Sequence, residues 1–218
     1  MKGLLIKDWK LIKNQKTFII SMIVISIFFL SSDKNMQFGF TYLSTMIVLL
    51  TTNTIAYDDQ NNGMGYLLTF PISRKYYVLE KYLFAAAALS ASLCASTVIL
   101  LLLSANGRVV LTPETFLTLL LSAILCAAII MSVLIPVQLK FGSEKTRIAL
   151  LIIFAGVFVI CYGIMHLAKT FSIDMSIISG YLKQASPIVI SVGIILLSLG
   201  MLTISCLISL AIIERKQF

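Results

Sequence analysis

Six long apolar runs restrict this chain more than any other feature. A helix needs about 20 apolar residues to cross the hydrocarbon core of a bilayer, which is about 30 Å thick. The first run is short and fits a tilted helix or a locally thinned bilayer. We therefore expect an all-α polytopic membrane protein, one transmembrane domain over 1–218 with six transmembrane helices. The expected spans are 17–32, 37–57, 82–104, 115–138, 148–168 and 187–213.

The composition agrees with a surface that faces lipid. Charged residues make up 12% of the 218 residues and hydrophobic residues 59%, with a mean hydropathy of +1.01. A soluble domain has roughly a quarter charged residues. All four cysteines, Cys94, Cys126, Cys161 and Cys206, lie in apolar runs. We expect them to be small packed thiols and not disulfides.

The Lys and Arg residues predict the orientation in the membrane. Thirteen of the seventeen lie at the two termini, in the 57–82 loop and in the 136–147 turn, and four lie in the other connections. Because Lys and Arg collect on the cytoplasmic side, both termini and these two connections are expected there. The same bias explains the net charge of +8 without nucleic acid as a partner.

The spans lack the groups that ion-driven carriers use. No Asp, Glu, Lys or Arg lies well inside a run, and His166, at the end of one, reads best as a solvated or hydrogen-bonded side chain. Metal clusters and a phosphate-binding Gly-x-x-x-x-Gly-Lys-Ser/Thr loop are absent from the sequence. The chain is therefore expected to have no catalytic residue, metal or cofactor of its own, and to receive energy from a separate nucleotide-hydrolysing partner.

The loop YDDQNNGMGYLLTFPISRKYYVLEKY, 57–82, is longer than a connection requires. It predicts a short cytoplasmic helix that Pro71 ends, after which Ser73 caps the helix of the third span. Either the short helix anchors in lipid or it docks on a partner. Arg74 and Lys75 oppose the dipole of the new helix, which anionic head groups or an acidic partner would compensate. The N-cap candidates of this short helix are Asp58, Asp59, Asn61 and Asn62. Its apolar stripe comprises Met64, Leu67 and Leu68.

Two further cytoplasmic segments are expected. Residues 1–16, MKGLLIKDWKLIKNQK, predict an interfacial amphipathic helix in which Asp8 falls among the apolar positions. Asp8 either pairs with a basic residue of another loop or faces water. The turn PVQLKFGSEKTR, 136–147, predicts a helix end, Gly142 as C-cap and Ser143 as the next N-cap. A simple topology-setting loop is its alternative.

These three segments together resemble the membrane subunits of type-2 ATP-binding-cassette (ABC) exporters, and the likeness covers the whole chain. LLIKDW, the 57–82 loop and PVQLKFGSEKTR carry it. More narrowly, the chain resembles the permeases of staphylococcal phenol-soluble modulin export. The resemblance implies a multi-pass protein of the bacterial cell membrane that exports amphipathic or hydrophobic substrates, such as these peptides, antimicrobial peptides or drugs.

The resemblance also implies partners and contact residues. The 58–81 loop would hold a coupling helix docked on an ABC ATPase, which binds the ATP and Mg, and a second permease subunit would complete a homodimer or paired complex. A non-transporting sensor or immunity module that binds a partner or peptide is the alternative. The implied ATPase contacts are Asp58, Asp59, Gly63, Met64, Gly65, Leu67, Leu68, Phe70, Pro71 and Arg74, with Lys140, Gly142, Glu144 and Arg147 as a second contact.

Overall fold

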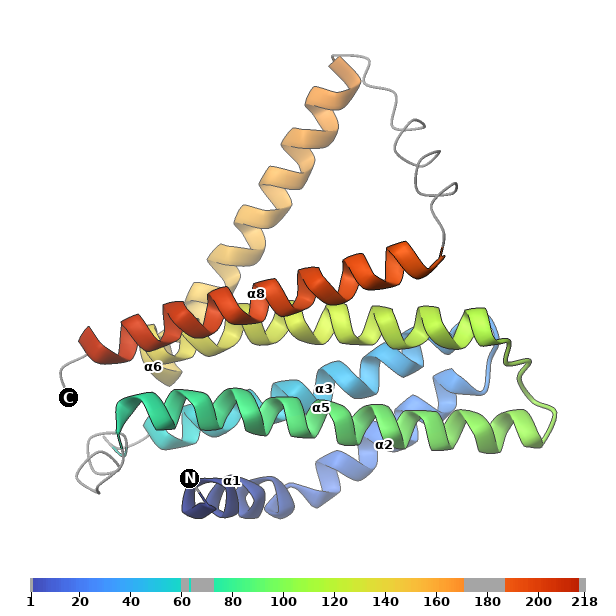
Figure 1. The fold of residues 1–218 in the computed structure, drawn as a ribbon, viewed down its shortest axis with the longest axis horizontal. Helices are drawn as coiled ribbons and strands as arrows, with labels where there is room; N and C mark the ends of the chain where they lie inside the picture. Colours follow the sequence, from blue (N-terminus) through green and yellow to red (C-terminus); the bar gives the residue numbers. More distant parts are fainter. Residues whose placement is uncertain (1, 60–62, 64–72, 171–186, 216–218) are drawn as a thin grey trace.

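The computed structural model describes residues 2–59, 63, 73–170 and 187–215, and the regular structure in these ranges is helical throughout (Figure 1). The all-α prediction is confirmed for this part of the chain. The helices are α1 (Lys2–Asn14), α2 (Lys16–Leu30), α3 (Met36–Asp59), α5 (Arg74–Ala105), α6 (Pro113–Thr170) and α8 (Pro187–Arg215).

Four of the described helices, or parts of them, are long and apolar enough to cross a membrane. They are Met36–Asp59, Arg74–Ala105, Pro113–Gly142 and Ile188–Arg215. The predicted first span coincides with α2, which has only 15 residues and qualifies only together with α1, across a bend of 68°. The structure therefore supports a multi-pass protein with four or five spans, and a sixth at 148–168 stays a prediction.

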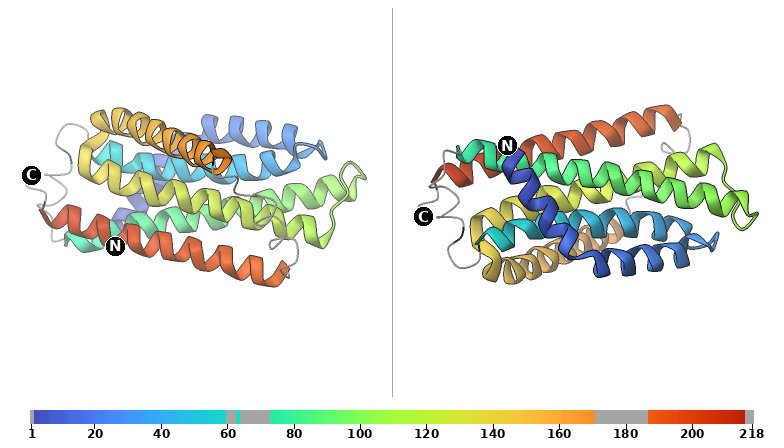
Figure 2. Two further views of the ribbon diagram at one scale, coloured as in Figure 1. Left: turned by 90° about the horizontal axis from the view of Figure 1, so that it is seen from above. Right: turned by 90° about the horizontal axis from the view of Figure 1, so that it is seen from below.

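The N-terminal helix α1 lies across the bundle and contacts α3 and α5 (Figure 2). The residues predicted to form its apolar arc do not share one environment: Leu4 is buried in the core, whereas Trp9 is 64% exposed. At the bend the Gln15 side-chain amide donates to the Tyr57 hydroxyl at 2.9 Å, which ties the start of α2 to the end of α3.

Helix α6 changes direction at Gly142. The helix passes through Pro136 without ending. Gly142 has φ 74° and ψ 179°, a backbone conformation that is essentially restricted to glycine. The predicted break at Gly142 is therefore confirmed, and beyond it the second half of α6 leaves the bundle (Figure 1).

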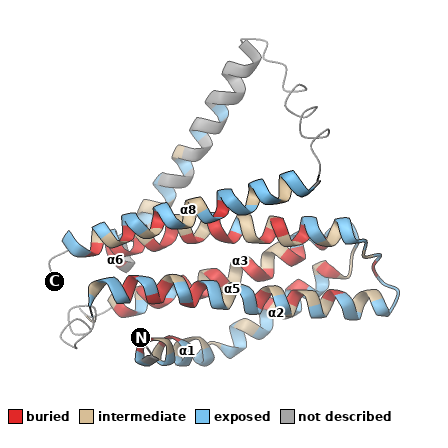
Figure 3. Ribbon diagram, viewed as in Figure 1, coloured by how far each residue is buried: buried red, intermediate tan, exposed pale blue. Residues whose placement is uncertain are grey.

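The largest buried cluster joins α1, α3, α5, α6 and α8, and buried residues follow the bundle along most of its length (Figure 3). Its central side chains include Ile55, Tyr77 and Ile135, and α8 adds Ile213. Hydroxyl groups join the helices farther along: Tyr82 bonds Ser205 at 2.6 Å, and Ser205 donates to the Ser132 carbonyl at 2.8 Å. Such interhelical hydrogen bonds stabilise packing where lipid supplies no hydrophobic drive.

Small residues of α5 are buried in the bundle, whereas two of the cysteines are exposed. Ala88, Ser92 and Ser96 are small residues four apart in α5, a spacing that lets helices approach closely. Ser92 and Ser96 are buried inside the bundle, which favours packing of this stripe within the chain. Cys94 and Cys126 are free thiols, as expected, but both are exposed on the bundle and not buried. On helices that face lipid, an exposed thiol is an apolar group in an apolar solvent.

Candidate functional site

Charged side chains are buried where α1, α3 and α5 meet. Asp8 of α1 is 0% exposed, Asp58 of α3 is 6% exposed, and Lys81 of α5 is 3% exposed. Charges this deep persist only when they are paired and hydrogen-bonded. We refer to this group as the ionic cluster; its members are Lys7, Asp8, Thr54, Asp58, Tyr77 and Lys81.

Lys81 is the centre of the ionic cluster. Its Nζ lies 2.5 Å from Asp8 Oδ2, 2.9 Å from Asp58 Oδ2 and 3.0 Å from Thr54 Oγ1. An ammonium group has three N–H donors, so each one has an acceptor. Thr54 in turn donates to Asp8 Oδ2 at 3.1 Å, which fixes that carboxylate from α3 as well.

Lys7 and Tyr77 complete the ionic cluster. Lys7, with 31% of its side chain exposed, donates to Asp58 Oδ1 and lies 3.5 Å from Asp8 Oδ1. The Tyr77 hydroxyl donates to Asp58 Oδ2 at 2.9 Å. Two ammonium groups therefore face two carboxylates, which balances the charge of these four side chains.

Glu80 is a third buried acid beside the ionic cluster. Its side chain is 1% exposed, and its Oε2 lies 3.9 Å from Lys81 Nζ. Neither carboxyl oxygen accepts a hydrogen bond within the described part of the chain. The three N–H groups of Lys81 already donate to the two aspartates and Thr54. Glu80 therefore has only an electrostatic attraction to Lys81, without a hydrogen bond.

The ionic cluster joins the two helices that precede and follow residues 60–72. Asp58 lies in the last turn of α3, and Lys81 lies in the third turn of α5. Lys7 and Asp8 connect α1 to the same two helices.

A second contact joins the end of α3 to the break in α6. A Cβ atom built on Gly142 would lie 2.5 Å from Asp59 Oδ2, so any side chain there would require the Asp59 carboxylate to move. The Thr146 hydroxyl donates to the Gly142 carbonyl. Asp59 and Gly142, predicted from two separate segments, are neighbours.

The start of α5 is joined to the end of α8. Ser73 is the N-cap of α5, as predicted, and its side chain accepts from the Tyr76 amide. Arg74 donates to the carbonyls of Ile213 and Glu214 at 3.2 and 3.3 Å. Lys75 lies 3.2 Å from Glu214. The α8 terminus therefore compensates these two cations, where the sequence analysis expected head groups or a partner.

The predicted contact residues divide into several groups. Asp58 and Asp59 lie inside α3, so their prediction as N-caps of a short helix is wrong, and the Asp58 carboxylate faces the ionic cluster. Gly63 is helical and half-buried, and Lys140 lines a pocket between α6 and α8. The side chains of Glu144 and Arg147 lie outside the described residues. So do the residues Met64, Gly65, Leu67, Leu68, Phe70 and Pro71.

Most of the ionic cluster was not predicted from the sequence. Asp58 was singled out, but for other roles, and the pairing of Asp8 with a basic residue was one of two alternatives; the structure shows that pairing. A stronger signal was present in the spacing. Thr54 and Asp58 are four apart in α3, and Tyr77 and Lys81 are four apart in α5. Residues at this spacing share a helix face, so each helix end carries a short polar stripe.

The comparison with protein families assigns the chain. The family described as ABC-2 family transporter protein matches residues 3–214. No curated protein and no solved structure matches the chain. The match extends from α1 through the ionic cluster to the last turn of α8, and it agrees with several apolar helices of membrane-spanning length. This protein belongs to the ABC-2 transporter family and is a transmembrane subunit of an ABC transporter.

Proposed function

We propose that this chain is the permease of an exporter and that its 58–81 loop carries a coupling helix docked on a separate ABC ATPase. The ionic cluster is the observation that carries this proposal, because it joins both flanks of the loop to α1. A docked helix moved by ATP binding would pull on α3 and α5 together. Met64, Leu67 and Leu68 supply the apolar contact stripe in this proposal. A second contact is supplied by Lys140, Gly142, Glu144 and Arg147.

The proposal extends to orientation and assembly. The bias of Lys and Arg toward the termini, the 57–82 loop and the 136–147 turn favours both termini in the bacterial cytoplasm. A second permease subunit, either the same chain or a paralogue, would complete the pathway, with one ATPase bound under each. The complex would draw its energy from ATP and Mg on the ATPase.

The docking role is tested with the ATPase itself. The permease and its ATPase are co-purified, and hydrolysis is measured for the wild type, Leu67→Asp and Leu68→Asp. A charge on the apolar stripe should abolish assembly or uncouple hydrolysis. Val110→Asp is the matched control, because Val110 is 76% exposed and lies in a connection on the opposite side. Normal assembly and coupling in both loop variants would disprove the docking role.

For the substrate we propose amphipathic, membrane-seeking peptides such as phenol-soluble modulins. Spans without buried charge in their interior, but rich in hydroxyl and aromatic side chains, suit a substrate that enters sideways from lipid. An amphipathic helical peptide should stimulate hydrolysis by the reconstituted complex, whereas a scrambled peptide of the same composition should not. Equal responses to both would exclude amphipathic peptides, and no ATPase binding at all would favour a sensor or immunity module.

A further inference from the structure

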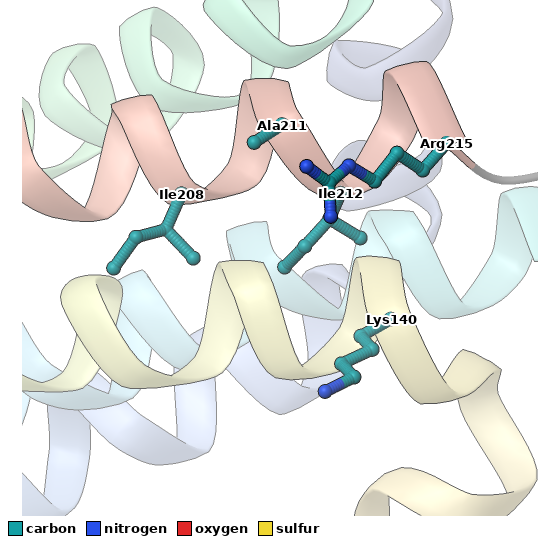
Figure 4. A pocket seen from close by; sticks show the side chains of 5 residues that line it. All are labelled: Lys140, Ile208, Ala211, Ile212 and Arg215. Atoms are coloured by element: carbon teal, nitrogen blue, oxygen red, sulfur yellow. The ribbon is translucent and has the colours of Figure 1, made fainter.

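A pocket of about 480 Å³ lies between α6 and α8 and shares only Lys140 with the proposed ATPase contacts. Its lining combines two basic side chains with an apolar wall: Lys140, Ile208, Ala211, Ile212 and Arg215. Figure 4 shows Ile208 and Ile212 between the two helices, Arg215 extending back along α8, and Lys140 on the facing helix α6. The volume is in the range of small-molecule sites.

The two cations of the pocket have no ion pair among the described residues. The end of α8 would ordinarily use a basic residue to satisfy its last carbonyls. Arg74 of α5 already donates to the carbonyls of Ile213 and Glu214, and Glu214 pairs with Lys75. Other residues therefore bind the last carbonyls of α8 and the Glu214 carboxylate, and the Arg215 side chain lines the pocket.

The apolar wall of the pocket continues along α8 toward the middle of the span. Ile204, Ile208 and Ile212 are four residues apart, so they form one stripe on the helix. Ile204 and Ile208 are 60% and 49% exposed, and no described side chain covers the stripe completely. A ligand that fits this site has an anionic head at the polar end of the helices and a chain that follows the stripe.

We propose that this pocket binds an anionic phospholipid, with its phosphate between Lys140 and Arg215 and an acyl chain along Ile212, Ile208 and Ile204. Basic pockets between transmembrane helices recognise lipid head groups in this way. Arg215, the last residue of α8, and Lys140, two residues before the α6 break, lie where the spans end, at the depth of head groups. A soluble anion would match the cations but leave the apolar stripe without a partner.

The site is tested by counting bound lipid. Purified protein is exchanged into mixtures of phosphatidylglycerol and phosphatidylcholine, and retained lipids are counted by native mass spectrometry. The wild type should retain phosphatidylglycerol in preference. Lys140→Gln with Arg215→Gln should weaken that binding about 30-fold, since each basic residue near the surface contributes about fivefold. Lys140→Arg with Arg215→Lys keeps both charges and should retain the lipid.

The control removes the same charge elsewhere. Lys34→Gln with Arg108→Gln deletes one Lys and one Arg that are both exposed at the other end of the bundle. If it loses phosphatidylglycerol as strongly as the pocket variant does, binding reflects net charge and the proposal is wrong. Equal retention of the two lipids overturns it as well. Full competition by inorganic phosphate would assign a free-phosphate site instead of a lipid site.

Discussion

At the scale of single residues, the buried Lys81 shows how a charge is kept stable away from water. Transfer of an ammonium group out of water is strongly unfavourable, and its attraction to nearby carboxylates offsets this only when the geometry is good. Lys81 Nζ has three oxygens at 2.5 to 3.0 Å, two of them on aspartates from different helices. The arrangement is stable as a set and unstable when one member is missing.

Lys81→Met should therefore lower the free energy of unfolding by about 3–5 kcal/mol, because it leaves Asp8 and Asp58 buried beside a single partly exposed ammonium group. Denaturant unfolding of the purified protein measures the change. Lys75→Met, on the same helix, is the control: it breaks a pair whose side chains are 68% and 51% exposed. Its effect should be about 1 kcal/mol or less. Equal effects of the two variants would contradict the role given to Lys81.

At the scale of elements, two helix ends are fixed by contacts from other helices. The α6 break at Gly142 lies against Asp59 at the end of α3, and the last carbonyls of α8 are bound by Arg74 at the start of α5. In each case a residue next to the 60–72 loop holds a helix that is distant in sequence. The ends of this loop therefore set the position of α6 and α8 as well as that of α3 and α5.

Gly142→Ala should destabilise the protein by about 1–3 kcal/mol, because alanine does not tolerate this backbone conformation. The methyl group would also meet the Asp59 carboxylate. Asp59→Ala in the same chain should relieve the crowding but leave the backbone strain, so recovery in thermal unfolding should be partial. Gly156→Ala is the control, since it has open space and a helical backbone in the same α6. A Gly142→Ala protein as stable as the Gly156→Ala protein would refute this account.

Arg74→Gln should loosen the last turn of α8, since two carbonyls lose a charged donor. Water replaces part of the loss at this exposed end, so the stability change should be only about 1 kcal/mol. The more sensitive readout is hydrogen exchange, which should quicken in the 209–215 region and not in α3. Arg108→Gln serves as the comparison. Unchanged exchange in α8 would show that Arg74 does not hold this helix end.

At the scale of the whole molecule, the charged side chains of the described residues lie outside the middle of the spans. Glu80, Lys81 and Asp58 lie just outside the predicted spans 37–57 and 82–104, and Asp8 lies in α1. The middle of each described span has hydroxyl groups but no ionisable pair of the kind that a proton-driven carrier requires. Energy input through protein contact at one end fits this distribution.

Transport by the reconstituted complex should therefore continue unchanged when the proton gradient is dissipated at constant ATP. The measurement is the initial rate of peptide uptake into inverted vesicles, with and without a protonophore. Omission of ATP provides the reference for zero activity. A rate that falls with the gradient while ATP is kept constant would place a proton pathway in this chain and would overturn the proposed energy source.

The sequence predicts the helices well because each depends on local properties. Apolar runs, Ser73 as an N-cap and the break at Gly142 are all visible without knowledge of the neighbours. The helix ends around the loop are harder to predict: Asp58 has the sequence properties of an N-cap, yet Lys7, Tyr77 and Lys81 hold it inside α3. Those partners lie up to 51 residues away, so only the packing of α1 against α3 and α5 reveals them.

The glycine at 142 has a further consequence for the amplitude of movement. Beyond it, α6 continues for 28 residues to Thr170 as a single rod, which at 1.5 Å per residue is roughly 42 Å long. A rotation of about 5° at Gly142 would thus displace the far end of this rod by roughly 4 Å. By leverage alone, a small movement beside Asp59 at the break would therefore be amplified into a displacement of several ångströms at Thr170.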